Sequence, residues 1–222
     1  LMRERVPYDT VKDFAPVTLA VTSPNVLVVQ PSLPVKSVRE LITLAKARPG
    51  ELNYASAASG TSNHLAAELF NHMAGVNIVR ITYKGMGAAV NDILAGQVQM
   101  LFATATVAAP HVQSGRMKAL AVTSAQPSTA YPGLPTIAAS GLPGYESALN
   151  AGVLAPAKTP EPVINRLNQE IVRALNNADV KERFRNIGVE VVAGPPEHFA
   201  SKIKSEIVSM GKIIRDAGIR AD

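Results

Sequence analysis

The residues best suited to chemistry lie in one stretch of small side chains, Asn53 to His64, with the sequence NYASAASGTSNH. Small residues leave room for a ligand to approach the main chain, and a helix that starts here presents unpaired amide groups in its first turn. The partial positive charge of that helix end favours a carboxylate or a phosphate. The candidate ligand contacts in this stretch are Ser56, Ser59, Gly60, Thr61, Ser62 and His64.

A catalytic reading of the same stretch makes Ser59 or Ser62 the nucleophile of a hydrolase. Such a serine needs a base within hydrogen-bond reach and a third group that orients the base. The stretch lacks the Gly-x-Ser-x-Gly pattern of a nucleophile elbow. The four histidines, His64, His72, His111 and His198, show no spacing that suggests a triad. The stretch could also be a loop with a purely structural role.

A metal site is the second alternative, because His64, Glu68 and His72 are four residues apart and share one helical stripe. This stripe lies opposite the apolar positions of the same helix, so we expect it to be a solvated face. His64 lies in the first turn beside the loop, where it is positioned to support the loop. Neither a metal ion nor an organic cofactor is expected.

Alternating strands and helices surround the candidate site. Strands are predicted at 52–56, 77–83, 98–103 and 117–123, with helices at 62–73, 88–95 and 107–113. This order predicts parallel pairing, with helices on both faces and ligands bound at the carboxyl ends of the strands. One sheet edge then receives residues 56–62, 83–87 and 103–106. In the second of these loops, Tyr83, Lys84 and Gly85 are expected to form another wall of the site.

The two ends of the chain are predicted to build a second lobe. Residues 14–29 form two strands interrupted at 23–24, and a capping box at Ser37 starts a helix. The last third holds a strand at 149–157 and helices from about 160, 180 and 196. In the first of these helices, Thr159 is the expected cap and Leu167 belongs to the buried stripe. Because this third has few strands, we expect residues 151–222 to join residues 1–23 in one lobe, with residues 24–150 as the other.

The composition excludes several classes of protein. Of 222 residues 47% are hydrophobic and 18% charged, which is typical of an ordered globular chain. The net charge of +5 is scattered and forms no basic cluster, so no nucleic-acid partner is expected. There is no Cys for disulfides or thiolate sites. No apolar run has the length of a membrane span, and residues 1–15 do not have the pattern of an export signal.

Several segments resemble the receptors of tripartite tricarboxylate transporters, the TctC or Bug family of periplasmic solute-binding proteins. These segments are VPYD at 6–9, DFAPV at 13–17, NVLVV at 25–29, the stretch 53–64, YKG at 83–85, ILAGQV at 93–98, ALAVTS at 119–124, LPT at 134–136 and LAPA at 154–157. They follow one another in order over essentially the whole chain.

The resemblance implies a fold and a function. The fold is α/β and of the type II periplasmic-binding-protein kind, with two lobes joined by two crossing strands. The function is that of a periplasmic receptor, not an enzyme, which closes on a small di- or tricarboxylate and delivers it to a membrane permease. In this family main-chain and hydroxyl groups, often with waters, hold the carboxylate. Ser56, Ser59, Gly60, Thr61, Ser62 and His64 match one such loop, and Tyr83, Lys84 and Gly85 match its neighbour.

The chain departs from the family pattern at three places. Many relatives have Asp after the Leu-Phe pair, whereas this chain has Ala103 and Thr104, which makes an amino-acid ligand less favoured. Relatives often have Trp in the cleft where this chain has Asn150. Relatives also start with a further strand and loop, so we expect an N-terminally incomplete first lobe with an exposed sheet edge that invites association. A ligand sensor that signals to a protein partner is the alternative function.

Overall fold

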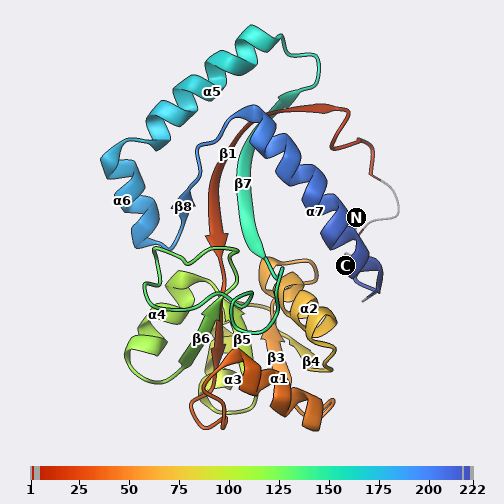
Figure 1. The fold of residues 1–222 in the computed structure, drawn as a ribbon, viewed down its shortest axis with the longest axis vertical. Coiled ribbons are helices and arrows are strands. Elements are labelled where there is room, and N and C mark those ends of the chain that lie inside the picture. The colour runs from red at the N-terminus through yellow and green to blue at the C-terminus, as the bar shows by residue number, and fades with distance from the viewer. Residues whose placement is uncertain (1, 3–5, 217, 221–222) are drawn as a thin grey trace. The chain divides into compact units, whose positions relative to one another are not determined.

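The computed structural model of the protein describes residues 2, 6–216 and 218–220. The described residues form two compact units. Unit 1 comprises the residues up to Ser23 together with those from Leu149 onward, and unit 2 runs from Pro24 to Ala148. The chain passes between the units inside two strands, β1 (Phe14–Pro24) and β7 (Ala148–Pro156) (Figure 1).

Unit 2 contains a five-stranded sheet in the order β4-β3-β5-β2-β6. Its strands are β2 (Val26–Val29), β3 (Asn53–Ser56), β4 (Val79–Thr82), β5 (Met100–Ala103) and β6 (Lys118–Val122). β3 pairs in parallel with both β4 and β5, as the alternating pattern predicts. β2, however, lies antiparallel between β5 and β6. The sheet is therefore mixed, because β2 begins at the edge where β5 and β6 end.

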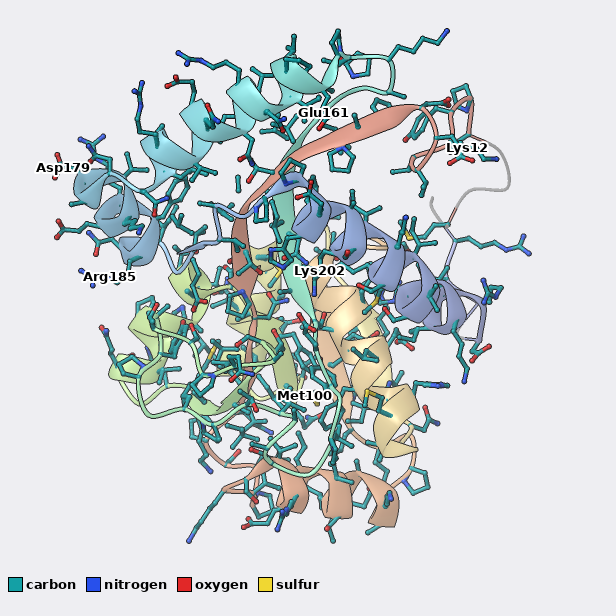
Figure 2. All side chains as sticks on the ribbon, turned by 45° about the horizontal axis from the view of Figure 1, so that its top comes forward. Lys12, Met100, Glu161, Asp179, Arg185 and Lys202 are labelled. Carbon is teal, nitrogen blue, oxygen red and sulfur yellow. The ribbon has the colours of Figure 1, made fainter. Side chains whose placement is uncertain are left out.

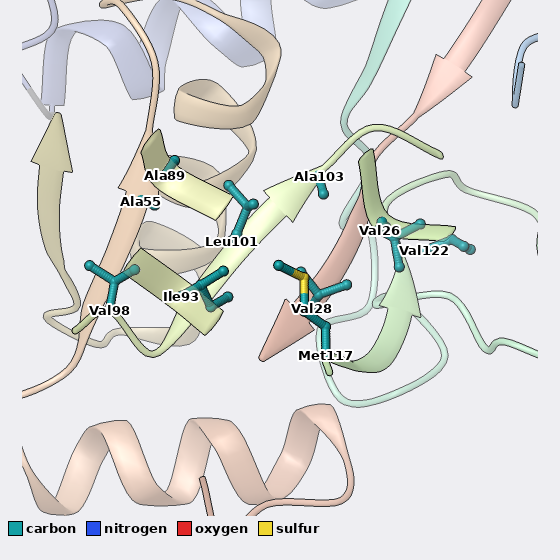
Figure 3. Close-up of a cluster of buried hydrophobic side chains, with 11 residues drawn as sticks. Val26, Val28, Ala55, Ala89, Ile93, Val98, Leu101, Ala103, Met117 and Val122 are labelled. Carbon is teal, nitrogen blue, oxygen red and sulfur yellow. The ribbon is translucent and has the colours of Figure 1, made fainter. Parts of the chain in front are cut away.

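Helices cover both faces of this sheet. α1 (Val38–Ala47) and α2 (Ser62–Ala74) belong to unit 2 with α3 (Met86–Leu94) and α4 (Ala105–Gln113). On one face, Ile93 of α3 and Ala108 of α4 belong to a buried cluster with strand residues that include Val28 and Leu101 (Figure 3). On the other face, Phe70 of α2 contacts the rings of Phe102 and Tyr145, with centroids 6.0 and 6.5 Å apart. Met100 lies among the packed side chains of this unit in Figure 2.

Local signals explain where the unit 2 helices begin and end. The Ser37 hydroxyl accepts from the Glu40 amide at 3.2 Å and starts α1. Gly75, with φ of 60°, ends α2 in the left-handed conformation that glycine tolerates. The predicted loop at 84–87 is shorter than expected, since Met86 and Gly87 already belong to α3.

Unit 1 contains a three-stranded sheet in the order β7-β1-β8, with β8 at Glu190–Val191. Strands of the last third of the chain thus pair with β1 of the opening segment. Its helices are α5 (Glu161–Leu175), α6 (Ala178–Asn186) and α7 (Pro196–Asp216). Asp179 and Arg185 of α6 lie on its outer side in Figure 2, and no described residue of α6 is buried.

Two predictions about α5 are wrong. Pro160 is its N-cap, with φ −58° and ψ 140°, and Thr159 lies one residue before it. Leu167 is 40% exposed, because the underlying cluster of Val17 and Ala155 reaches only Ile164 and the half-buried Ile171. Large apolar side chains of β7, among them Leu149 and Val153, are exposed as well.

Candidate functional site

The ends of three adjacent strands define one edge of the unit 2 sheet, here called the rim. β3, β4 and β5 run in the same direction and end at Ser56, Thr82 and Ala103. The helices that follow them begin at Ser62, Met86 and Ala105. The main chain joins two of the loops, since the Tyr83 amide donates to the Ser56 carbonyl at 2.9 Å. The three predicted loops therefore lie at one sheet edge.

The helices at the rim start without a side-chain cap. The N-cap residues are Thr61 for α2, Gly85 for α3 and Thr104 for α4, and none accepts a capping hydrogen bond through its side chain. By contrast, α1 follows β2, which ends at the side of the sheet away from the rim, and α1 is capped by Ser37. Within the described residues, no acceptor faces the amides of Ser62 and Asn63 at the start of α2. These amides are available to an anion.

The loop before α2 is shaped by internal hydrogen bonds. Gly60 has φ of 78°, and its amide donates to Nδ1 of His64 at 3.1 Å. The Thr61 hydroxyl lies 2.8 Å from the Ala58 carbonyl and also contacts Oδ1 of Asn63. The Thr61 hydroxyl is thus used within the loop. The amides of Ser62 and Asn63 take no part in these bonds.

Ser56 differs from its predicted role as a ligand contact. Its side chain is fully buried, and its hydroxyl donates to the Ala57 carbonyl at 3.1 Å while accepting from Nε of Arg80 at 2.6 Å. The single hydroxyl proton is therefore used within the loop. Arg80 was not predicted as a site residue. The available signal was its position two residues before the end of a strand that leads to the rim.

His64 corrects the prediction of a solvated stripe on α2. His64 is 3% exposed, whereas His72, two turns later, is exposed. Nε2 of His64 lies 4.0 Å from Oε1 of Glu68, which accepts a hydrogen bond from the Tyr54 hydroxyl. Burial, and then the bond to Glu68, raise the pKa of Tyr54 well above its usual value. The described residues contain no group of three or more side chains placed to hold a metal ion.

The second loop offers main chain more than side chain. The Tyr83 hydroxyl donates to Oδ2 of Asp92 on α3 at 2.8 Å, and burial followed by this bond raises the pKa of Tyr83 to about 12. Lys84 and Gly85 are exposed at the start of α3. Nδ2 of Asn63 lies 3.2 Å from the Met86 sulfur, so the first turns of α2 and α3 are in contact.

The third loop, after β5, lies next to Asn25, a residue that sequence reasoning missed. Ala103 is fully buried, whereas Thr104 is exposed with its hydroxyl 3.2 Å from that of Thr106. Asn25 directly precedes Val26, which pairs with Ala103, and its amide donates to the Thr123 hydroxyl at 2.8 Å. The buried side-chain nitrogen of Asn25 has no partner within the described part of the chain.

Asn150 belongs to the other unit. It lies on β7, and its side-chain amide donates to Glu206 of α7. Eleven of the twelve predicted site residues thus belong to unit 2, and Asn150 belongs to unit 1.

Comparison with known proteins decides the family. The family model of the tripartite tricarboxylate transporter family receptor, TctC, matches residues 1–219. The chain belongs to this family. Among relatives of this receptor, a UPF0065 protein encoded in the tcbD-tcbE intergenic region of Pseudomonas sp. strain P51 is 40% identical over 219 residues. That match covers 98% of this chain and 65% of the relative, so the chain spans about two thirds of the relative's length.

Protein BugT of Bordetella pertussis is 36% identical to the receptor over 215 residues, which is 97% of this chain and 66% of BugT. A solved structure, R. palustris Rpa4515 with adipate, is 36% identical, with a TM-score of 0.80 over 100% of this chain and 74% of that chain. These matches confirm the predicted family and its periplasmic-binding-protein-like α/β fold. No helix among the described residues is both long and apolar enough to cross a membrane.

Proposed function

We propose that this receptor binds a small di- or tricarboxylate at the rim, in the periplasm, and delivers it to a tripartite tricarboxylate-type permease. The observation that carries the proposal is the group of three uncapped helix N-termini at the ends of β3, β4 and β5. Neutral amides hold a carboxylate without a buried counter-ion in direct contact, and each charge-assisted hydrogen bond contributes roughly 1.5–3 kcal/mol. The adipate in the Rpa4515 structure supports a dicarboxylate as the class of ligand.

The contacts we assign are the main-chain amides of Ser62 and Asn63 at the start of α2, with Lys84, Gly85 and Thr104 at the neighbouring loops. The amides of Gly60 and Thr61 donate to His64 and to the Ala58 carbonyl, so these two residues shape the loop. The side chains of Ser56, His64 and Tyr83 stabilise these loops through hydrogen bonds within the protein. The receptor performs no chemistry on the ligand in this proposal. Release of the solute to the permease completes the proposed cycle.

The experiment removes the main-chain N–H group of Ser62 by substituting proline. Proline fits the first position of a helix, where it costs only the N–H group. Ser62→Pro suits α2 because Thr61, the preceding residue, already has φ −67° and ψ 157°. Its matched control is Ala178→Pro at the start of α6 in unit 1, where Asn177 has φ −59° and ψ 136°.

Titration calorimetry with dicarboxylates of four to eight carbons measures affinity for both variants. We expect Ser62→Pro to weaken binding about tenfold or more at unchanged stability, and Ala178→Pro to bind like the unaltered protein. A ligand at a hundred times its Kd should stabilise the protein by about 2.7 kcal/mol. If no carboxylate of the panel binds, or Ser62→Pro binds normally, the proposed site is wrong.

A further inference from the structure

Arg80 connects β4 to the loop that follows the neighbouring strand β3. Its three nitrogen atoms each contact a different oxygen of that loop: Nε to the Ser56 hydroxyl at 2.6 Å, Nη2 to the Ala57 carbonyl at 2.8 Å and Nη1 to the Ser59 hydroxyl at 3.2 Å. In the pairing of β3 with β4, Arg80 lies opposite Tyr54 and on the same face of the sheet. A residue of one rim strand therefore holds the loop of another.

The charge of Arg80 is not neutralised by an ion pair. All three of its hydrogen-bond acceptors are uncharged oxygens, and in the described part of the chain no carboxylate forms an ion pair with it. Glu68, the acidic residue of the same cluster, instead accepts from Tyr54 and lies near His64. A half-buried guanidinium beside the start of α2 thus adds a full positive charge to the partial charge of the helix end.

The direction of these bonds matters as much as the charge. A carbonyl oxygen turned toward a bound carboxylate repels it, whereas a hydroxyl group is favourable only when its proton points at the ligand. Arg80 holds the oxygen atoms of Ser56, Ala57 and Ser59 in place, and arginine does this well because its planar fork has five donors in fixed directions. The amides of Ser62 and Asn63 in the first turn of α2 are then left to the ligand.

We propose that Arg80 is the positioning residue of the carboxylate-binding loop and supplies the counter-charge behind it. This inference rests on the proposed carboxylate-binding function. It assigns Arg80 no direct contact with the ligand. It separates two contributions, the shape of the loop and the charge, which different substitutions remove.

Two variants of Arg80 test the two contributions. Arg80→Lys keeps the charge but replaces the planar fork of three nitrogen atoms with a single ammonium nitrogen, and Arg80→Met removes both the fork and the charge. The matched control is Arg116→Met. Nε of Arg116 also donates to a serine hydroxyl, that of Ser114 at 3.2 Å, but Arg116 lies between α4 and β6, away from the rim. The probe is adipate, titrated calorimetrically at several ionic strengths.

We expect Arg80→Lys to lower adipate affinity about tenfold or more with the salt dependence of the unaltered protein. Arg80→Met should lower it further and flatten the salt dependence, and Arg116→Met should change neither. Normal affinity in either Arg80 variant, or an unchanged salt dependence in Arg80→Met, would overturn the inference.

A measurement without ligand keeps this inference apart from the proposed function. Hydrogen exchange of the amides in residues 58–61 should accelerate in both Arg80 variants and remain unchanged in Arg116→Met. If the unaltered protein binds no carboxylate, the proposed function fails, and the counter-charge role fails with it; accelerated exchange would still establish Arg80 as the residue that shapes the loop. Unchanged exchange would refute that role too.

Discussion

Nδ1 of His64 accepts a hydrogen bond of 3.1 Å from the main-chain amide of Gly60, four residues earlier. The bond closes the loop before α2 on the first turn of the helix. Gly60 has φ of 78°, in the left-handed region, and His64 is buried and accepts the bond through an unprotonated Nδ1. Gly60 and His64 can each be substituted separately.

Gly60→Ala should destabilise unit 2 by about 1–2 kcal/mol, because a side chain at this φ strains the backbone. Urea unfolding followed by circular dichroism measures the change. The matched control is Gly87→Ala within α3, where an added Cβ would have no neighbour within 4 Å. There alanine should be neutral or stabilise the helix by up to about 1 kcal/mol. Equal effects of the two substitutions would contradict the strained geometry of Gly60.

His64→Ala should cost about 1–3 kcal/mol of unfolding free energy, because it leaves the Gly60 amide without its acceptor and opens space under the loop. The exposed His72 on the same helix provides the control, since His72→Ala should change stability by no more than about 0.5 kcal/mol. Both variants are compared by chemical unfolding and by exchange of the Gly60 amide. An unchanged exchange rate in His64→Ala would show that the bond is not formed in solution.

Stability should fall in alkaline solution as tyrosines lose their protons. Burial, then the bond to Asp92, raise the pKa of Tyr83 to about 12 from a usual value of 10.0, so the folded state binds this proton more tightly than the unfolded state. The resulting stabilisation is fully present below pH 10 and is lost as the pH rises from about 10 to 12. Tyr131, whose pKa burial raises to about 12, adds to the same fall.

Tyr83→Phe removes one of these groups. Unfolding free energies measured between pH 8 and pH 12 should therefore decline less steeply in this variant than in the unaltered protein. A decline of equal slope would show that Tyr83 titrates alike in both states.

The exposed apolar strand β7 should promote self-association. Its side chains Leu149 and Val153 are 56% and 38% exposed, and it lies at the edge of the three-stranded sheet. Val153→Lys places a charge on this edge and should reduce the weight-average mass seen by sedimentation equilibrium. Val208→Lys on α7 replaces a more exposed valine, at 74%, outside any strand and should have little effect. A monodisperse monomer of the unaltered protein would refute the prediction.

Much of this receptor could be predicted from its sequence because the signals are local. A hydroxyl at Ser37, glycine at Gly75 and the run of small residues after Asn53 each act over one or two turns, and they place α1, α2 and the loop between β3 and α2. The order of strands and helices also predicted the common edge for three loops. The family followed from short segments in order along the chain.

Only the tertiary structure decided which partners these residues have. The stripe of His64, Glu68 and His72 reads as solvated, but His64 is buried and lies 4.0 Å from Glu68, which accepts a hydrogen bond from Tyr54 of β3. Ser56 reads as a ligand donor until Arg80, 24 residues away, occupies its hydroxyl. Local sequence determines where a helix starts, because capping and turn energies depend on near neighbours. The use of a hydroxyl, an imidazole or a guanidinium depends on contacts between distant segments, which the pairing of strands creates.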